Sequence, residues 1–341
     1  MKKDRIDDSF GISPVGPSKK IKASIRKAVK SINEHPTAGL TRLNRLFSSK
    51  FGIQEEGILL AGSMEELIYL IPSVFRPERV LVLGPAPDIY GDASSAAGAE
   101  VSYLNTDEKS GFSADTGEIK EKLKGIDLLF ISNPNRITGR LIDRKSLYPA
   151  LSVAMEKKTC IVLDESLIEF TGDDDYYENL SKSNRLIVIR TTANFYGLQG
   201  LELAWAVTSP ETASVLKKHI HWRINNLAVE AARTALRDDA YRRLAIKHIN
   251  DEKRLLLNAF KKLACVKIYH SDANILLLKL ESNWEKIAGA LSESGISIKN
   301  CADIVGLDSS YLRLSVMKHE SNLKFIRILT RLVKNLTNRD A

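Results

Sequence analysis

Cysteine is scarce in this chain, and long apolar runs are missing from it. The 341 residues include only three cysteines, Cys160, Cys265 and Cys301, which lie far apart with no Cys-x-x-Cys spacing. A disulfide framework and a metal site are therefore not expected. Every longer apolar stretch is broken by charge or proline before it reaches the roughly 18 residues of a membrane span, and no apolar signal segment opens the chain. We expect a cytoplasmic protein without membrane association.

A dense basic tract is also missing. Lys and Arg outnumber Asp and Glu by 50 to 42, a formal charge of +8, but the excess is scattered and has no interleaved aromatic residues. This pattern does not favour a nucleic-acid partner, and it suits anionic metabolites. With 44% hydrophobic and 27% charged residues, the chain can fold around a large core.

The first two thirds of the chain alternate short β-branched runs with amphipathic segments, which is typical of a parallel sheet covered by helices. Strands are expected at residues 79–83, 100–104, 127–132, 159–163, 185–190 and 203–207. Helical spacing of apolar residues is found at 65–75, 88–97, 119–123 and 146–156.

Beyond Pro210 the pattern changes to longer helices and alternating strands. Helices are expected at 211–221, 225–260, 284–292 and 321–336, and strands at 266–269, 273–280, 297–300 and 311–316. A helix at 18–32 is expected to pack with this part. We therefore predict an α/β fold whose large, mainly parallel domain spans residues 41–235, with a small α+β domain made of 1–40 and 236–341.

Polar residues gather where the predicted strands end, which is where open α/β sheets form their ligand crevice. Residues 133–139 read Asn-Pro-Asn-Arg-Ile-Thr-Gly, a turn directly after one strand. Asp164 follows another strand and can pair with a cationic ring nitrogen or cap the next turn. Residues 61–66 lead into a helix whose free N–H groups can hold a phosphate, although Ser63 can also be a plain N-cap.

The order of these segments resembles the fold type I pyridoxal-phosphate (PLP) enzymes of the class I/II aminotransferase superfamily. Among them it is most similar to the threonine-phosphate decarboxylases of cobalamin synthesis and next to the histidinol-phosphate aminotransferases. The resemblance covers nearly the whole chain and is carried by residues 12–17 (Ile-Ser-Pro-Val-Gly-Pro), 195–201 (Phe-Tyr-Gly-Leu-Gln-Gly-Leu), 222–228, 273–277, 299–301 and 311–316. It implies PLP as cofactor, a homodimer, and action on a phosphorylated amino acid.

The resemblance also shows where this chain departs from the family. The family's lysine that forms a Schiff base with PLP corresponds to Asn194, whose amide cannot form an imine. The arginine that pairs with the cofactor phosphate corresponds to Glu202. A carboxylate about 4 Å from a phosphate is repelled by about 4 kcal/mol per charge at an effective dielectric near 20.

Five further positions have changed. By the resemblance, Arg136 replaces the asparagine that hydrogen-bonds the ring oxygen, and Pro87 replaces the aromatic residue that stacks on the ring. Met64 takes the place of the phosphate-loop serine. Leu167 stands for an aromatic residue beyond the strand-end aspartate, and His35 for a tyrosine that helps to bind substrate.

Three positions are kept. Asp164 would hold the pyridinium nitrogen, and Thr191 would touch the phosphate. Arg313 would bind the substrate α-carboxylate, or it could simply bridge the two domains.

Three functions remain open at this point. The chain is a pseudoenzyme that regulates or binds a partner, such as a related decarboxylase or a cobalamin-pathway protein. Alternatively, it uses PLP or pyridoxamine phosphate without a Schiff-base lysine to decarboxylate or transaminate a phosphorylated amino acid, with His35 or Arg136 as base. In the third hypothesis the crevice binds a small anion or amino acid without cofactor, through Arg136, Thr138 and Arg313.

Overall fold

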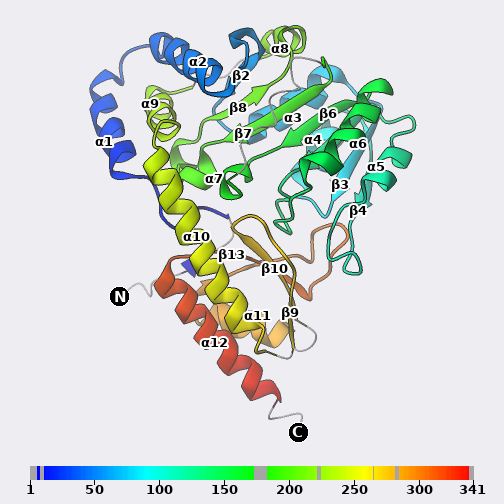
Figure 1. Ribbon diagram of the computed structural model, residues 1–341, viewed down its shortest axis with the longest axis vertical. Helices are drawn as coiled ribbons and strands as arrows, with labels where there is room; N and C mark the ends of the chain where they lie inside the picture. The colour runs from blue at the N-terminus through cyan, green and yellow to red at the C-terminus, as the bar shows by residue number, and fades with distance from the viewer. Residues whose placement is uncertain are drawn as a thin grey trace.

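The chain folds into a large upper lobe and a smaller lower lobe, connected by the long helix α10 (Asp239–Phe260) (Figure 1). The computed structural model describes residues 6–7, 11–172, 183–220, 224–263, 265–280 and 284–337. The first two residues of the 222–228 segment lie outside these ranges.

The upper lobe is built on a seven-stranded sheet. Its order is β2 (Ile58–Ala61), β8 (Ala204–Val207), β7 (Leu186–Thr191), β6 (Cys160–Asp164), β5 (Leu128–Ser132), β3 (Arg79–Gly84) and β4 (Glu100–Asn105). Strands β3 to β7 run parallel, whereas β8 is antiparallel to both β7 and β2. The predicted mainly parallel sheet is confirmed, and β2 is a strand that was not predicted.

Helices cover both faces of this sheet, as predicted, because the strand residues alternate between two apolar cores. One core joins Val80 and Val82 to α3 (Met64–Phe75), α4 (Ile89–Ala96) and α8 (Pro210–Lys217). The other joins Leu81 and Leu83 to the opposite helices, α2 (Thr37–Phe51), α5 (Thr116–Lys122), α6 (Arg144–Glu156) and α9 (Asn226–Ala235).

The lower lobe is the expected α+β unit. Its four-stranded antiparallel sheet has the order β12 (Lys299–Asn300), β13 (Tyr311–Ser315), β10 (Ile275–Leu280) and β9 (Val266–Ile268). Helices α10, α11 (Trp284–Glu293) and α12 (His319–Thr337) pack with it (Figure 1). The N-terminal strand β1 (Ile6–Asp7) pairs with β11 (Ile296–Ser297), so the start of the chain joins this lobe.

Three elements differ from the prediction. The helix expected at 18–32 does not pack with the small domain, since it contacts α9 of the upper lobe. The stretch 225–260 is not one helix but two, since the chain turns after α9 and Asp238 caps α10. The Asp238 carboxylate accepts hydrogen bonds from the Tyr241 N–H (3.4 Å) and the Ser18 hydroxyl (2.8 Å), just before α1 (Lys19–Ala28). Helix α2 was not predicted either.

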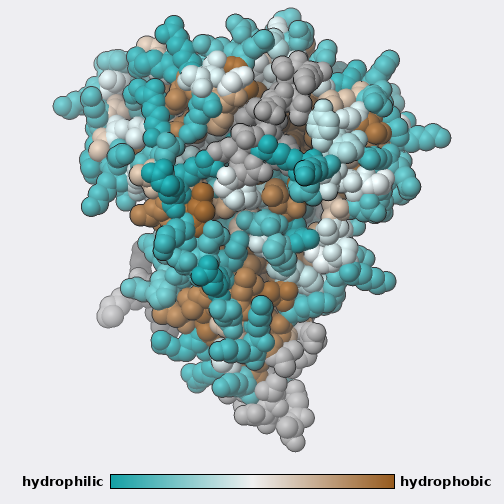
Figure 2. Space-filling view, viewed as in Figure 1, coloured by the Kyte–Doolittle hydropathy of each residue, from teal (hydrophilic) through white to brown (hydrophobic). Residues whose placement is uncertain are grey.

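The visible face of the molecule is mostly hydrophilic, with hydrophobic residues gathered on the lower lobe (Figure 2). No helix in the described ranges is long and apolar enough to cross a membrane. No disulfide joins the three described cysteines; Cys160 and Cys301 are buried, and Cys265 is half-buried. The described residues contain no cluster of three His, Cys, Asp or Glu side chains suited to a metal ion.

Candidate functional site

The N-terminus of α3 is already bonded to carboxylates of the chain itself. The Ser63 hydroxyl accepts a hydrogen bond from the Glu66 N–H (3.3 Å), so Ser63 is the N-cap. The Glu66 side chain accepts from the Gly62 N–H (2.8 Å), and the Met64 N–H donates to Glu202 Oε1 (3.1 Å). The N–H groups expected to hold a phosphate therefore face two carboxylates.

Glu202 lies at the junction of this helix end and β7. Besides the Met64 N–H, its Oε1 accepts the Thr191 hydroxyl proton at 2.5 Å. Burial raises the pKa of the Glu202 carboxyl, and the nearby Glu65 adds to this shift against the two hydrogen bonds. Met64, Thr191 and Glu202 thus form one hydrogen-bonded cluster. It lies at the position that the resemblance assigns to the cofactor phosphate.

Asp164 stands at the end of β6 and is almost completely buried. Its Oδ2 accepts the Tyr90 hydroxyl at 2.5 Å and lies 3.7 Å from Arg136 Nη1, while Oδ1 accepts from the Ser166 N–H (2.8 Å). Burial and the adjacent carboxylate raise the pKa of Tyr90 well above 10, so this phenol donates its proton. Both Asp164 oxygens thus have partners within the chain.

Asn194 lies in the short helix α7 (Ala193–Tyr196), between these two ends of the crevice. It is buried, and its backbone carbonyl accepts a hydrogen bond from the Ser13 N–H (2.8 Å), which attaches the N-terminal segment to the site.

Arg313 approaches the crevice from β13 of the lower lobe. Its Nη1 donates to the Arg136 carbonyl at 3.4 Å, a contact between the two lobes. Thr138 is buried, and its hydroxyl accepts from the Arg140 N–H (3.2 Å), so it serves the turn rather than the crevice.

Two predicted positions lie elsewhere. His35 lines a hollow of about 580 Å³ with residues of α1, α2 and α9, and its Nδ1 is 2.6 Å from the Thr37 hydroxyl. Leu167 is buried in the apolar core. The structure therefore forms two bonded groups, Met64 with Thr191 and Glu202, and Arg136 with Asp164, and leaves His35 apart.

Sequence reasoning missed Tyr90, which bonds Asp164 directly. Tyr90 lies in the first turn of α4, three residues after Pro87, and its ring stacks on Phe130 with centroids 5.1 Å apart. The available signal was an aromatic residue just inside a helix that begins at the crevice. Glu66 was missed as well, although a glutamate three residues after an N-cap serine is a typical capping box.

Comparison with known proteins agrees with this architecture. The family pattern described as "Aminotransferase class I and II" matches residues 13–329. The histidinol-phosphate aminotransferase 2 of Archaeoglobus fulgidus is 30% identical over 330 residues, covering 96% of this chain and 93% of that protein. The threonine-phosphate decarboxylase of Salmonella typhimurium is 25% identical over 338 residues, covering 98% and 93%.

A solved structure gives the same result. The histidinol-phosphate aminotransferase of Clostridium acetobutylicum superposes with a TM-score of 0.91 at 28% identity and covers 97% of this chain and 99% of that one. The resemblance to PLP-dependent enzymes of fold type I is thereby confirmed. The chain belongs to the class I and II aminotransferase family, among proteins similar to threonine-phosphate decarboxylase and histidinol-phosphate aminotransferase.

Proposed function

We propose that this chain is a pseudoenzyme of the family, a homodimer that binds and regulates a protein partner instead of catalysing PLP chemistry. A related decarboxylase or another protein of cobalamin synthesis is the partner that the resemblance suggests. The proposal rests mainly on one observation, the position of the Glu202 carboxylate between the Met64 N–H and the Thr191 hydroxyl.

Glu202 takes the donors that a cofactor phosphate would need. A phosphate brought to the same place would displace this carboxylate and would then face Glu65, Glu66 and Glu202 without a cation from the position of the family's arginine. The residues present therefore do not fit PLP in its family position.

The ring end of the crevice supports the same proposal. Asp164, which would neutralise a pyridinium nitrogen, already bonds the Tyr90 hydroxyl and the Ser166 N–H, with the Arg136 guanidinium beside it. Asn194 offers no amine for a Schiff base. The phosphate, the ring nitrogen and the aldehyde of PLP would therefore each meet a residue that already has partners or cannot react.

A PLP titration of the purified protein, followed by visible absorbance and calorimetry, tests this proposal. We expect no binding at high micromolar PLP for the native chain. Asn194→Lys alone should give no turnover of threonine phosphate, because Glu202 and Arg136 still exclude the cofactor. The triple variant Asn194→Lys, Glu202→Arg and Arg136→Asn should regain PLP binding with the absorbance of a Schiff base.

Asn184→Lys is the matched control, since it adds a lysine at an exposed position and reports non-specific reaction with the aldehyde. Tight PLP binding by the native chain, or turnover by Asn194→Lys alone, would contradict the proposal.

Co-expression with an active threonine-phosphate decarboxylase tests the partner role. We expect a mixed assembly by size-exclusion chromatography with light scattering, and an altered turnover of the decarboxylase. A chain that stays separate and leaves this turnover unchanged would refute the regulatory role while leaving the loss of PLP chemistry intact.

A second candidate function is supported by the contact between Arg313 and Arg136. In this contact the Arg313 guanidinium donates to the main-chain carbonyl of Arg136 where the lobes meet, and a guanidinium at this place suits a carboxylate. Thermal shift with amino acids and phosphorylated amino acids tests this candidate. A stabilising ligand that PLP does not displace would favour it over the pseudoenzyme.

A further inference from the structure

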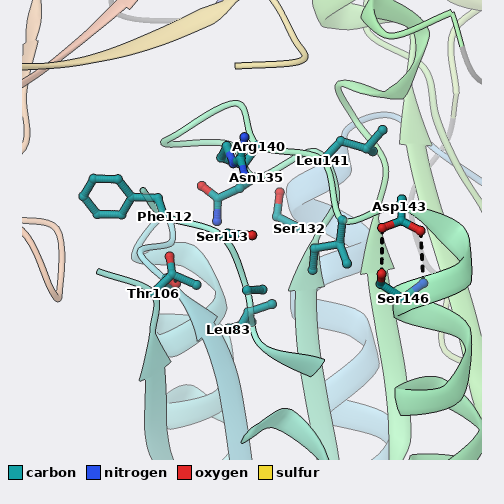
Figure 3. Close-up of a pocket in the computed structure, with 13 residues that line it drawn as sticks. Leu83, Thr106, Phe112, Ser113, Ser132, Asn135, Arg140, Leu141, Asp143 and Ser146 are labelled. Carbon is teal, nitrogen blue, oxygen red and sulfur yellow. Dashed lines mark hydrogen bonds between the residues drawn. The ribbon is translucent and has the colours of Figure 1, made fainter. Parts of the chain in front are cut away.

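A second polar cavity lies on the other face of the large sheet. It has a volume of about 180 Å³ and opens where β3, β4 and β5 end, next to α6 (Figure 3). Its wall residue Leu83 belongs to the core of α5 and α6, whereas Met64 and Tyr90 of the crevice belong to the core of α3 and α4. The cavity therefore lies on the α5 and α6 side of the strand ends, with Ser132 of its wall next to Tyr90 of the crevice.

Arg140 is the only basic side chain of this cavity wall. The residue is half-buried. Among the described residues, its buried Nε has no hydrogen-bond partner and its guanidinium forms no ion pair. Leaving a buried N–H donor without a hydrogen-bond partner is unfavourable. An anion in the cavity would remove this deficit.

The turn that carries Arg140 is firmly held. The Arg140 N–H donates to the Thr138 hydroxyl (3.2 Å), and its carbonyl accepts from the Asn135 N–H (2.8 Å). Gly139 has a φ of +72°, and a Cβ atom there would lie 2.8 Å from the Ile275 carbonyl oxygen, so the turn requires glycine. Figure 3 shows the Arg140 and Asn135 side chains together at the top of the cavity, with Ser132 pointing up toward them.

The rest of the wall limits the ligand. The Thr106 and Ser132 hydroxyls already donate to the Gly84 and Pro134 carbonyls, so they offer no proton to an anion. One guanidinium balances one negative charge, and Asp143 in the wall disfavours a second. The cavity wall also has the apolar side chains of Leu83, Phe112 and Leu141.

We propose that this cavity binds a small monocarboxylate, with the carboxylate on the Arg140 guanidinium and a short apolar chain against Phe112 and Leu83. A water molecule takes about 30 Å³, so the volume suits an acid of about six non-hydrogen atoms, such as butyrate. The bidentate pairing of arginine with a carboxylate supplies the specificity. This site is independent of the proposed loss of PLP chemistry.

Calorimetric titration of the full chain with butyrate tests the site. We expect a dissociation constant of about 1 mM or lower. Arg140→Gln should weaken binding about tenfold to a hundredfold, because it removes the charged hydrogen bonds. Ala114→Leu, which adds bulk to the cavity wall while keeping Arg140, should also abolish binding.

Arg331→Gln is the matched control, since it removes a guanidinium from an exposed position of α12 and should change butyrate affinity by less than about twofold. Thermal melts verify that each variant is folded. The site is wrong if native protein shows no butyrate binding, or if Arg331→Gln abolishes binding while Arg140→Gln preserves it. Tighter binding of inorganic phosphate than of butyrate would overturn the ligand class.

Discussion

Two glutamates near the C-terminal ends of the parallel strands differ in the partners that hold their carboxylates. Glu165 follows β6 and is wholly buried. Its Oε2 accepts a hydrogen bond from Arg190 Nε and forms an ion pair with Arg190 Nη2, both at 2.7 Å. Glu202 is half-buried, and its Oε1 accepts from two neutral groups, the Thr191 hydroxyl and the Met64 N–H. Among the described residues, Glu202 forms no ion pair.

This difference separates the scaffold from the crevice. In the scaffold, a buried charge is matched by an opposite charge in good geometry, so that the fold keeps it at little net cost. In the crevice, a carboxylate stands where the resemblance places an arginine, and neutral donors hold it. The scaffold therefore fits the family's fold, while the crevice holds a carboxylate with neutral donors only.

Breaking the scaffold pair should have the largest effect on stability. Glu165→Ala leaves the Arg190 guanidinium buried without this carboxylate, and we expect the free energy of unfolding to fall by about 3–5 kcal/mol. Urea unfolding followed by circular dichroism measures the loss.

The double variant Glu165→Ala with Arg190→Met is the control for this prediction. It replaces the pair by neutral side chains and should recover a large part of the loss, because no buried charge remains unpaired. A loss below about 1 kcal/mol in the single variant would mean that the scaffold tolerates unpaired charge as well as the crevice does.

The fold could be read from the sequence because the apolar periodicities of strands and helices are local properties. The strands β3 to β7 were found within one residue at either end. The break between α9 and α10 was missed, since the apolar spacing continues through it and the turn depends on Asp238 and its contact with Ser18.

The site was predictable only in part. The strand-end rule and the resemblance together placed Asp164, Thr191 and Glu202 in one crevice. Tyr90 could not be found by spacing, because its bond to Asp164 joins residues 74 positions apart and depends on how α4 packs on the sheet. Arg140 was missed for a similar reason, since the sequence does not show which cations lack partners.

Neutralising Glu108, a carboxylate paired with two lysines at the contact between the lobes, should lower stability by an intermediate amount. Glu108 of the upper lobe accepts hydrogen bonds from Lys267 (2.7 Å), Lys279 (2.6 Å) and the Tyr311 hydroxyl (3.1 Å) of the lower lobe. Because the group is partly exposed, we expect Glu108→Gln to reduce the free energy of unfolding by about 1 kcal/mol, and less at high salt.

The pH dependence of this effect has a definite sign. The hydrogen bonds from Lys267 and Lys279 hold the pKa of Glu108 below its usual range, so its contribution is present at neutral pH and is lost as the pH falls below the unfolded-state value. The difference between native and variant protein should therefore shrink in acid. Glu118→Gln, at an exposed position of α5, is the matched control and should show no such trend.

Neutralising Glu202 in the crevice should have the smallest effect on stability, and this effect should have the opposite sign. Burial raises the pKa of Glu202, so the folded chain binds this proton more tightly than the unfolded chain does. The resulting stability is fully present below the unfolded-state pKa and is lost as the pH rises through the folded-state value. Gln at this position can still accept from Thr191 and Met64 but carries no charge.

We therefore expect Glu202→Gln to be more stable than the native chain at neutral pH, with the difference disappearing in acid. Urea unfolding between about pH 4 and pH 8 measures this, with Glu211→Gln as the control at an exposed position of α8. A native chain that gains stability over Glu202→Gln as the pH rises would mean that a cation neutralises Glu202, as Arg190 neutralises Glu165. The two glutamates would then no longer differ in kind, and Glu202 would no longer repel a phosphate.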